Sequence, residues 1–214
     1  MYKSIEICAG AGGQALGLEM AGFEHVALVE YEPDYCECLR KNRPGWNVEC
    51  MDVRHFDGRP YRGEIDTFTF PPKEQSQNAT VGDAIYDLMA AKGWKDAMAW
   101  RHKACKIAPT LVGGSKKHGG PDLGSTRARQ AWAELGIDGR GVANEAPEAD
   151  FTGMPRLTPR MLARLQGFPD DWDFGTKKTT ACRMIGNAFP PPVAKAVGLR
   201  IKEVLDSQAL DLAV

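Results

Sequence analysis

The chain has no apolar run long enough to cross a membrane and no basic-then-apolar start typical of a secretion signal. These absences favour a cytoplasmic protein with no membrane partner. The cysteines form no CxxC pair and no Cys/His spacing typical of zinc, so we expect reduced thiols and no metal site. The six are Cys8, Cys36, Cys38, Cys50, Cys105 and Cys182.

What remains is the composition of an ordinary globular protein. Of 214 residues, 43% are hydrophobic and 26% are charged, which suits one well-buried domain or a domain with a small appendage. The net charge of −1 is nevertheless unevenly distributed. Residues 1–66 hold 7 Lys/Arg against 12 Asp/Glu, whereas residues 91–130 hold 9 Lys/Arg against 2 Asp.

A local excess of cations indicates a polyanionic partner, although such a run can also be a solvated surface. Glycine and proline interrupt this one at residues 113–115, 118–121 and 124–126. We interpret the region as loops presenting cations, rather than as one face of a helix, and expect phosphate contacts from it.

The N-terminal third alternates predicted strands with predicted helices, which indicates βαβ units and a parallel sheet. After residue 72 this rhythm is lost, and the stretch up to Ser125 is too irregular to form a core alone. The predicted strands cover residues 4–8, 25–29, 48–51 and 65–70. The predicted helices cover residues 14–20, the segment from Pro33 to Leu39, 81–89, 94–100, 161–165 and 192–205, with residues 207–214 as a frayed tail.

A glycine-rich turn, Ala9 to Gly13, lies between the first predicted strand and helix. Such a turn lets the backbone approach a nucleotide closely. Glu30 ends the second strand, where a carboxylate can accept hydrogen bonds from ribose hydroxyls, and Asp52 follows the third. Both NAD and S-adenosylmethionine fit this arrangement. The turn has the pattern G-x-G-G and not the G-x-G-x-x-G of dinucleotide-binding proteins, which favours S-adenosylmethionine.

Three segments carry a resemblance to one family: residues 6–13, 155–169 and 185–191. In order and content they resemble the first, ninth and tenth conserved blocks of DNA cytosine-5 methyltransferases. The resemblance implies a Rossmann-like, S-adenosylmethionine-dependent α/β fold with a parallel sheet, here incomplete, and a small irregular target-recognition region. It divides the chain into a cofactor-binding part (1–79), the recognition region (80–150) and a return to the methyltransferase domain (151–214).

The same resemblance implies which residues bind cofactor and duplex DNA. The glycine turn would hold the methionine part of S-adenosylmethionine, Glu30 the ribose, and residues 31, 52 and 53 the adenine, with 187 and 188 closing the pocket. The implied cofactor residues are Cys8, Ala9, Gly10, Ala11, Gly12, Gly13, Glu30, Tyr31, Asp52, Val53, Asn187 and Ala188. Arg156, Arg160 and Arg164 would buttress the recognition region or touch the DNA backbone. The candidate DNA-binding residues are Lys116, Lys117, Arg127, Arg129, Arg156 and Arg160.

The family's nucleophile is missing. These enzymes add a cysteine thiolate, placed beside a pair of prolines, to carbon 6 of a flipped cytosine. Beside Pro71-Pro72 one register puts Lys73 in that place and another puts Phe70, and no cysteine lies between Cys50 and Cys105. The glutamate of the family's Glu-Asn-Val block is also absent, so no catalytic residue is assigned.

We interpret the stretch from Pro72 to Thr80 as a deletion joining two separated parts of a methyltransferase. The lost segment would carry further strands and leave an open sheet edge. Three explanations stay open: the remaining sheet has repacked, a second chain or a second copy of this one completes it, or the molecule contains residues that this sequence omits. Three functions stay open: a methyltransferase inactive as this chain stands, a binding remnant or half of a split enzyme, and a nicotinamide-dependent oxidoreductase.

Overall fold

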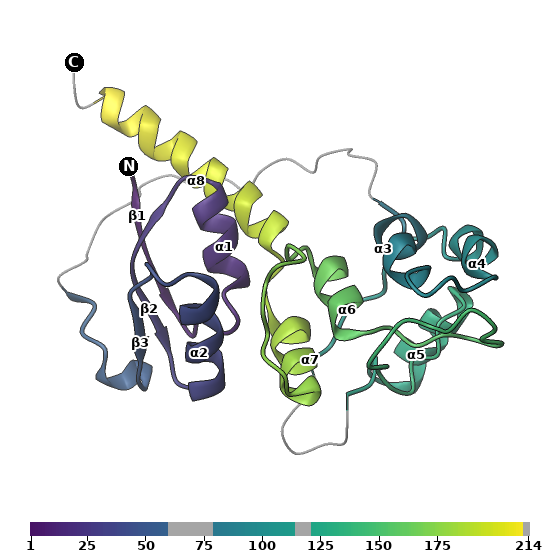
Figure 1. Ribbon diagram of the computed structural model, residues 1–214. Helices are drawn as coiled ribbons and strands as arrows, with labels where there is room; N and C mark the ends of the chain where they lie inside the picture. The colour runs from purple at the N-terminus through teal and green to yellow at the C-terminus, as the bar shows by residue number, and fades with distance from the viewer. Residues whose placement is uncertain (60–78, 114–120, 212–214) are drawn as a thin grey trace. The chain divides into compact units, whose positions relative to one another are not determined.

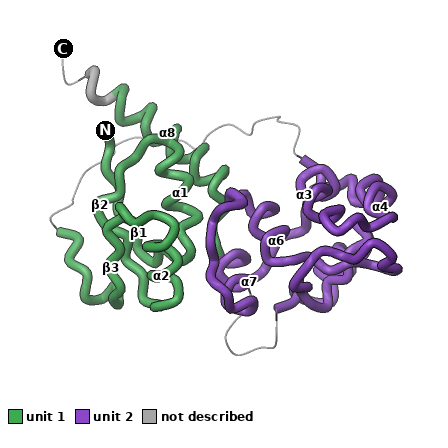
Figure 2. The backbone as a smooth tube through the Cα atoms, viewed as in Figure 1, with its two compact units in different colours: residues 1–75, 188–214 green, residues 76–187 purple. Residues whose placement is uncertain are grey.

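The computed structural model describes residues 1–59, 79–113 and 121–211, and of residues 208–211 the backbone alone. The chain forms two compact units (Figure 2). Unit 1 contains residues 1–75 and 188–214, and unit 2 contains residues 76–187. The chain therefore leaves unit 1 once and returns to it for the last helix.

Unit 1 is built on a parallel sheet in the order β1-β2-β3 (Figure 1). The strands are β1 (Lys3–Ile7), β2 (Glu24–Glu30) and β3 (Val48–Cys50), and α1 (Gly13–Met20) and α2 (Pro33–Asn42) connect them. A short 3-10 helix, η1 (Val53–His55), follows β3. The predicted α/β class and its first three strands are confirmed, whereas the strand predicted at residues 65–70 lies outside the described residues.

The last helix, α8 (Pro191–Asp211), packs along α1. The two helices approach closely at Gly17, where a Cβ would lie 2.8 Å from the backbone nitrogen of Lys195. Among the elements of unit 1, α1 provides the main contact of α8. The frayed tail predicted for residues 207–214 is wrong as far as Asp211, because no glycine or proline interrupts the helical backbone after Gly198.

Unit 2 is helical in its described part. Its helices are α3 (Val81–Met89), α4 (Ala97–Lys103), α5 (Thr126–Glu134), α6 (Pro159–Gln166) and α7 (Lys178–Asn187). Ile85, Trp132 and Met161 are among its fully buried side chains. Helix α6 contains the helix predicted at residues 161–165, and Gly167 caps it in the left-handed conformation, with φ of 93°.

Three helices of unit 2 correct the sequence interpretation. Arg127 and Arg129 lie on α5 and not in a loop, because the Ser125 side chain accepts a hydrogen bond from the amide of Ala128 and Trp132 anchors the helix in the core. Helix α7 was not predicted, and α4 begins three residues later than the predicted start at Trp94.

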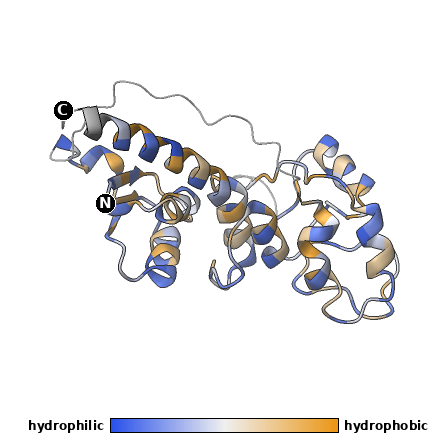
Figure 3. Ribbon diagram, turned by 90° about the horizontal axis from the view of Figure 1, so that it is seen from above, coloured by the Kyte–Doolittle hydropathy of each residue, from blue (hydrophilic) through white to orange (hydrophobic). Residues whose placement is uncertain are grey.

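Figure 3 shows hydrophilic and hydrophobic residues interspersed along α8, as expected for a helix that covers a core on one side. Within the described residues, no helix combines the length and the hydropathy that a membrane span requires.

Candidate cofactor and DNA sites

The glycine turn after β1 has a backbone that few side chains tolerate. Cys8, Gly10 and Gly12 have φ angles of 58°, 58° and 81°, and the amide of Gly12 donates to the carbonyl of Ala9 over 3.0 Å. A Cβ at Gly10 would meet no atom within 4 Å. The turn therefore presents open backbone at the carboxyl end of β1, directly before the first turn of α1.

Glu30 ties the end of β2 to this turn. Its buried carboxylate accepts from the amide of Gly10 over 2.7 Å, and from the amides of Tyr31 and Glu32 over 2.8 Å each. A carboxylate has about four lone-pair positions, so these amides leave acceptor capacity for a further donor. The structure thus brings the predicted glycine turn and the predicted ribose carboxylate into direct contact.

Two apolar side chains are exposed on the segments that follow β2 and β3. Tyr31 is 66% exposed and Val53 is 38% exposed. Between them in sequence, Asp52 accepts hydrogen bonds from the Arg54 guanidinium at 2.6 and 3.0 Å. That guanidinium holds the pKa of Asp52 well below its usual range, so the carboxylate is ionised and already paired.

A second buried carboxylate, Glu6 on β1, was missed by the sequence reasoning. It is 5% exposed, and its Oε2 has no hydrogen-bond partner. Burial and the nearby charge of Glu30 raise the pKa of Glu6 to about 8. The signal in the sequence was an acidic residue alternating with Ile5 and Ile7 in a strand.

Asn187 and Ala188, predicted to close the pocket, fall on the two sides of the division between the units. Asn187 ends α7 in unit 2, so its part in closing the pocket stays a prediction. Within unit 2 the segment Val112–Gly113 lies against the end of α7. A Cβ at Gly186 would lie 2.5 Å from the carbonyl carbon of Val112, and a Cβ at Gly113 would overlap the Asn187 side chain.

The cationic excess of residues 91–130 is partly neutralised by acidic residues from outside that window. Lys92 pairs with both Glu145 and Glu148. Arg101 pairs with Asp83 over 2.8 Å, and Lys106 with Glu134 over 3.8 Å. A net charge counted along the sequence therefore overstates the positive charge available to a polyanion.

The predicted DNA-binding residues differ in how much of their charge is available. Lys116 and Lys117 lie outside the described residues. Arg127 is exposed and has no acidic partner among the described residues, whereas the buried Nε of Arg129 makes no hydrogen bond there. Arg156 pairs with the buried Asp138 over 3.0 Å, and both line a cleft of about 460 Å³.

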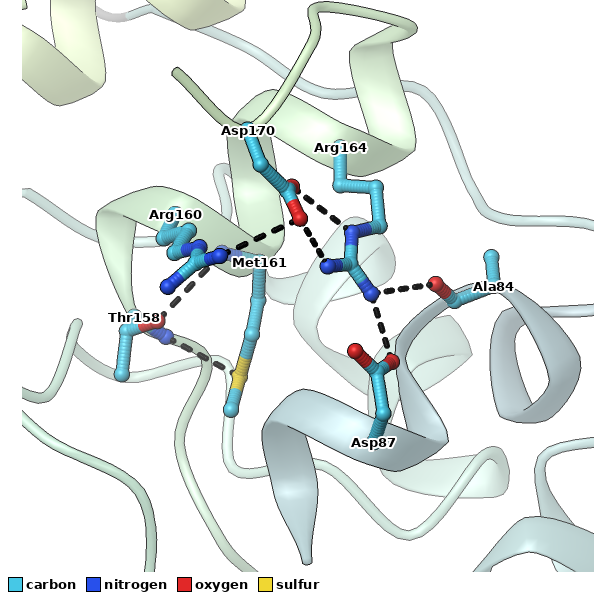
Figure 4. Close-up of polar contacts among 7 residues, drawn as sticks. All are labelled: Ala84, Asp87, Thr158, Arg160, Met161, Arg164 and Asp170. Carbon is cyan, nitrogen blue, oxygen red and sulfur yellow. Dashed lines mark hydrogen bonds and ion pairs between the residues drawn. The ribbon is translucent and has the colours of Figure 1, made fainter. Parts of the chain in front are cut away.

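Arg160 and Arg164 converge on Asp170 (Figure 4). Arg164 also reaches α3, where it donates to the carboxylate of Asp87 over 2.5 Å and to the carbonyl of Ala84 over 3.4 Å. Its side chain is 23% exposed. This guanidinium joins α6 to α3.

Two of the buried cysteines, Cys36 and Cys182, are poorly suited to act as nucleophiles. Burial raises the pKa of the Cys36 thiol to about 12 and that of Cys182 to about 11, whereas a reactive thiol needs a lowered pKa. Cys50 ends β3, facing solvent. Neither Cys36 nor Cys182 is therefore a substitute for the missing family nucleophile.

A parallel βαβ sheet whose glycine turn meets a buried acidic residue at the carboxyl edge defines a nucleotide-binding protein of the Rossmann-like class. Comparison with known proteins identifies the family. The family described as "C-5 cytosine-specific DNA methylase" matches residues 2–77 and 72–203. The chain belongs to this family, whose members use S-adenosylmethionine as methyl donor and act on DNA.

Curated relatives agree with this assignment. The Type II methyltransferase M.NgoMIV of Neisseria gonorrhoeae is 35% identical, in an alignment that spans 97% of this chain and 99% of the relative. M.NaeI of Lentzea aerocolonigenes is also 35% identical, over 95% of this chain and 75% of the relative. A DNA modification methyltransferase from an Escherichia coli prophage has the same fold, with a TM-score of 0.59 at 15% identity, covering 96% of this chain and 100% of that one.

The alignments also locate the deletion inferred from the sequence. The two family matches meet at residues 72–77. The alignment with M.NgoMIV extends over 312 positions, although this chain has 214 residues, so at least 98 positions (312 less 214) have no counterpart here. A segment of the relatives is therefore absent from this chain.

Proposed function

We propose that this chain is a cytosine-5 DNA methyltransferase of a restriction-modification system that binds S-adenosylmethionine and duplex DNA but transfers no methyl group on its own. One observation carries the proposal: the family matches meet at residues 72–77, where the nucleophile is expected beside Pro71-Pro72. Carbon 5 of cytosine does not take a methyl group until a thiolate adds to carbon 6. Without that thiolate, the chain can bind S-adenosylmethionine and DNA but cannot transfer the methyl group.

The residues present fit the cofactor. The open backbone at Gly10 provides room for its methionine end, and Glu30 retains acceptor capacity for a ribose hydroxyl. Exposed Tyr31 and Val53 offer apolar surface for the adenine ring. When bound, S-adenosylmethionine supplies an electrophilic methyl group, and these side chains would hold and orient it.

DNA binding in the proposal depends on unit 2 and on residues 80–150 as the recognition region, followed by a return to the methyltransferase domain at 151–214. Among the predicted contacts, Arg127 has the clearest support because it is exposed and makes no ion pair in the described part of the chain. For a protein that acts on DNA with S-adenosylmethionine, we expect a cytoplasmic location.

The test measures binding and chemistry separately on the intact chain. Calorimetry with S-adenosylmethionine, and with NAD as the control ligand, measures cofactor binding. Gel shifts at two salt concentrations measure DNA binding, which should weaken as salt rises. Tritiated methyl transfer, and trapping on a duplex containing 5-fluorocytosine, measure the chemistry.

We expect binding of S-adenosylmethionine and DNA, no binding of NAD, and neither methyl transfer nor a covalent adduct. An adduct or incorporated methyl would overturn the claim of inactivity, and failure to bind S-adenosylmethionine would overturn the cofactor assignment. Arg127→Gln should lower the salt dependence of DNA binding by about one unit of log–log slope. Arg101→Gln is the matched control, because Arg101 is already paired with Asp83.

The gap of at least 98 positions (312 less 214) favours, as a second candidate, one half of a split enzyme. A second chain, or a second copy of this one, would then complete the sheet. Sedimentation of the purified chain tests the second copy. A dimer that transfers methyl groups would support it, and an inactive monomer would support the first proposal.

A further inference from the structure

Strand β1 buries one charged residue and exposes an apolar neighbour. Ile7 is 58% exposed, whereas its neighbour Glu6 is 5% exposed. Glu6 is paired in register with Leu28, and Leu28 is fully buried against α1 and α2 through Ala15 and Leu39. The side chain of a strand residue shares its face with its register partner, so Glu6 points to the face that carries this core.

The Glu6 carboxylate is incompletely satisfied there. Its Oε2 is buried without a partner. Glu30, the carboxylate close enough to affect it, is held by the amides of Gly10, Tyr31 and Glu32. A buried acid in such a position either keeps its proton or requires a cation.

The described elements around Glu6 do not supply that cation. On β2, His25 bonds Ser4 and the carbonyl of Ala15, and burial lowers its pKa, so it is held neutral. On α2, Cys36 donates to the carbonyl of Glu30, and Arg40 donates to the carbonyl of Val48. Beyond β2, β3 ends in Cys50, a further thiol without positive charge.

The glycine turn begins two residues after Glu6, and Gly10 in that turn is bonded to Glu30. We propose that Glu6 carries a proton in the free protein and, on cofactor binding, gives it up and supplies the countercharge for the cationic methionine end of the cofactor. This inference depends on the proposed function, and it adds a residue and a proton balance to that site. The Glu6 O–H bond breaks, the proton goes to the buffer, and no other bond changes.

The proton balance is measured by calorimetry of the intact chain at pH 7, in two buffers of different ionisation enthalpy. With a pKa of about 8 in the free protein, Glu6 is roughly nine-tenths protonated at this pH, so binding should release about 0.9 proton. Glu6→Gln should release none. Glu24→Gln, at an exposed position of β2, is the matched control and should behave as the wild type.

A pH series provides a second measurement. Between pH 5.5 and 7 the cofactor's own amino group stays largely protonated, so the change in affinity reports on the protein. If Glu6 must lose its proton, affinity should rise about 30-fold over this range in the wild type. In Glu6→Gln the affinity should stay nearly constant over this pH range. The variant keeps His25, so the difference between the two proteins excludes any contribution of His25.

S-adenosylhomocysteine shows which positive charge Glu6 balances, because it keeps the ammonium group of the cofactor and lacks the sulfonium. Proton release with both ligands would show that Glu6 balances the ammonium group. Release with S-adenosylmethionine alone would show that it balances the sulfonium. Binding without proton release in the wild type, or equal release in Glu6→Gln, would overturn the inference while leaving the proposed function intact. Failure of the wild type to bind either ligand would instead overturn the proposed function.

Discussion

Replacing Glu6 by glutamine should stabilise the free protein at neutral pH. The carboxyl has a pKa of about 8 in the folded chain, against an ordinary value of 4.5. Between these values the folded state holds a proton that the unfolded state has released. The wild type therefore loses stability as the pH rises through this window, whereas a glutamine at the same position has no proton to lose.

The magnitude follows from the two pKa values. At pH 7 the unfolded state gains about 3 kcal/mol from ionising Glu6, and the folded state gains almost nothing. At pH 5 the corresponding gain is about 1 kcal/mol. Glu6→Gln should thus exceed the wild type in free energy of unfolding by about 3 kcal/mol at pH 7 and by about 1 kcal/mol at pH 5.

The assay must report on unit 1, because Glu6 lies in this unit and a global readout would average over both compact units. Hydrogen exchange of a peptide containing β2, read by mass spectrometry and corrected for the pH dependence of intrinsic exchange, meets this requirement. Peptides from residues 76–187 serve as an internal reference. Glu24→Gln should leave the exchange of both units unchanged.

The reasoning is refuted if Glu6→Gln is no more stable than the wild type at pH 7, or if its advantage is the same at pH 5 and pH 7. The first result would mean that the ionised carboxylate is satisfied in the free protein. The second would mean that the variant acts through packing and not through a proton.

Three further outcomes are expected. Gly17→Ala should destabilise unit 1 by about 1–3 kcal/mol in thermal unfolding, since its methyl group would overlap the backbone of α8; Gly45→Ala, with no atom within 4 Å, is the control. Arg164→Met should release α3 from α6 and raise the pKa of Asp170 from about 2 toward its ordinary 3.8. The stability that the wild type loses through Asp170 between pH 4 and pH 2 should then no longer depend on pH in that range, and NMR titration of Asp170 measures the pKa change. Gly186→Ala should displace the segment at residue 112, seen as faster hydrogen exchange there, and unchanged exchange would contradict the observed packing.

Much of unit 1 could be predicted from the sequence, because its signals are local. Alternating strands and helices, the glycines after β1 and the acidic residue ending β2 all lie within short segments, and the structure places each as expected. The predictions that failed were also local. The glycines near Ser125 suggested loops, but the helix after them depends on the burial of Trp132, a tertiary contact.

The charge pattern shows the same limit for the DNA site. Counting Lys and Arg along residues 91–130 found a cationic excess, and the fold then supplied Asp83, Glu145 and Glu148 to neutralise part of it. Those partners are separated from their cations by as many as 56 residues. No sequence window short enough to be informative could have included them.

The sequence by itself determined the family and the missing nucleophile, because conserved blocks and an absent cysteine are properties of residue identity and order. It also determined the nucleotide turn, whose backbone needs glycine. Only the tertiary structure decided that Glu6 is buried without a partner and that Arg164 joins two helices. Burial and pairing depend on which distant segments meet, and that is settled when the chain packs.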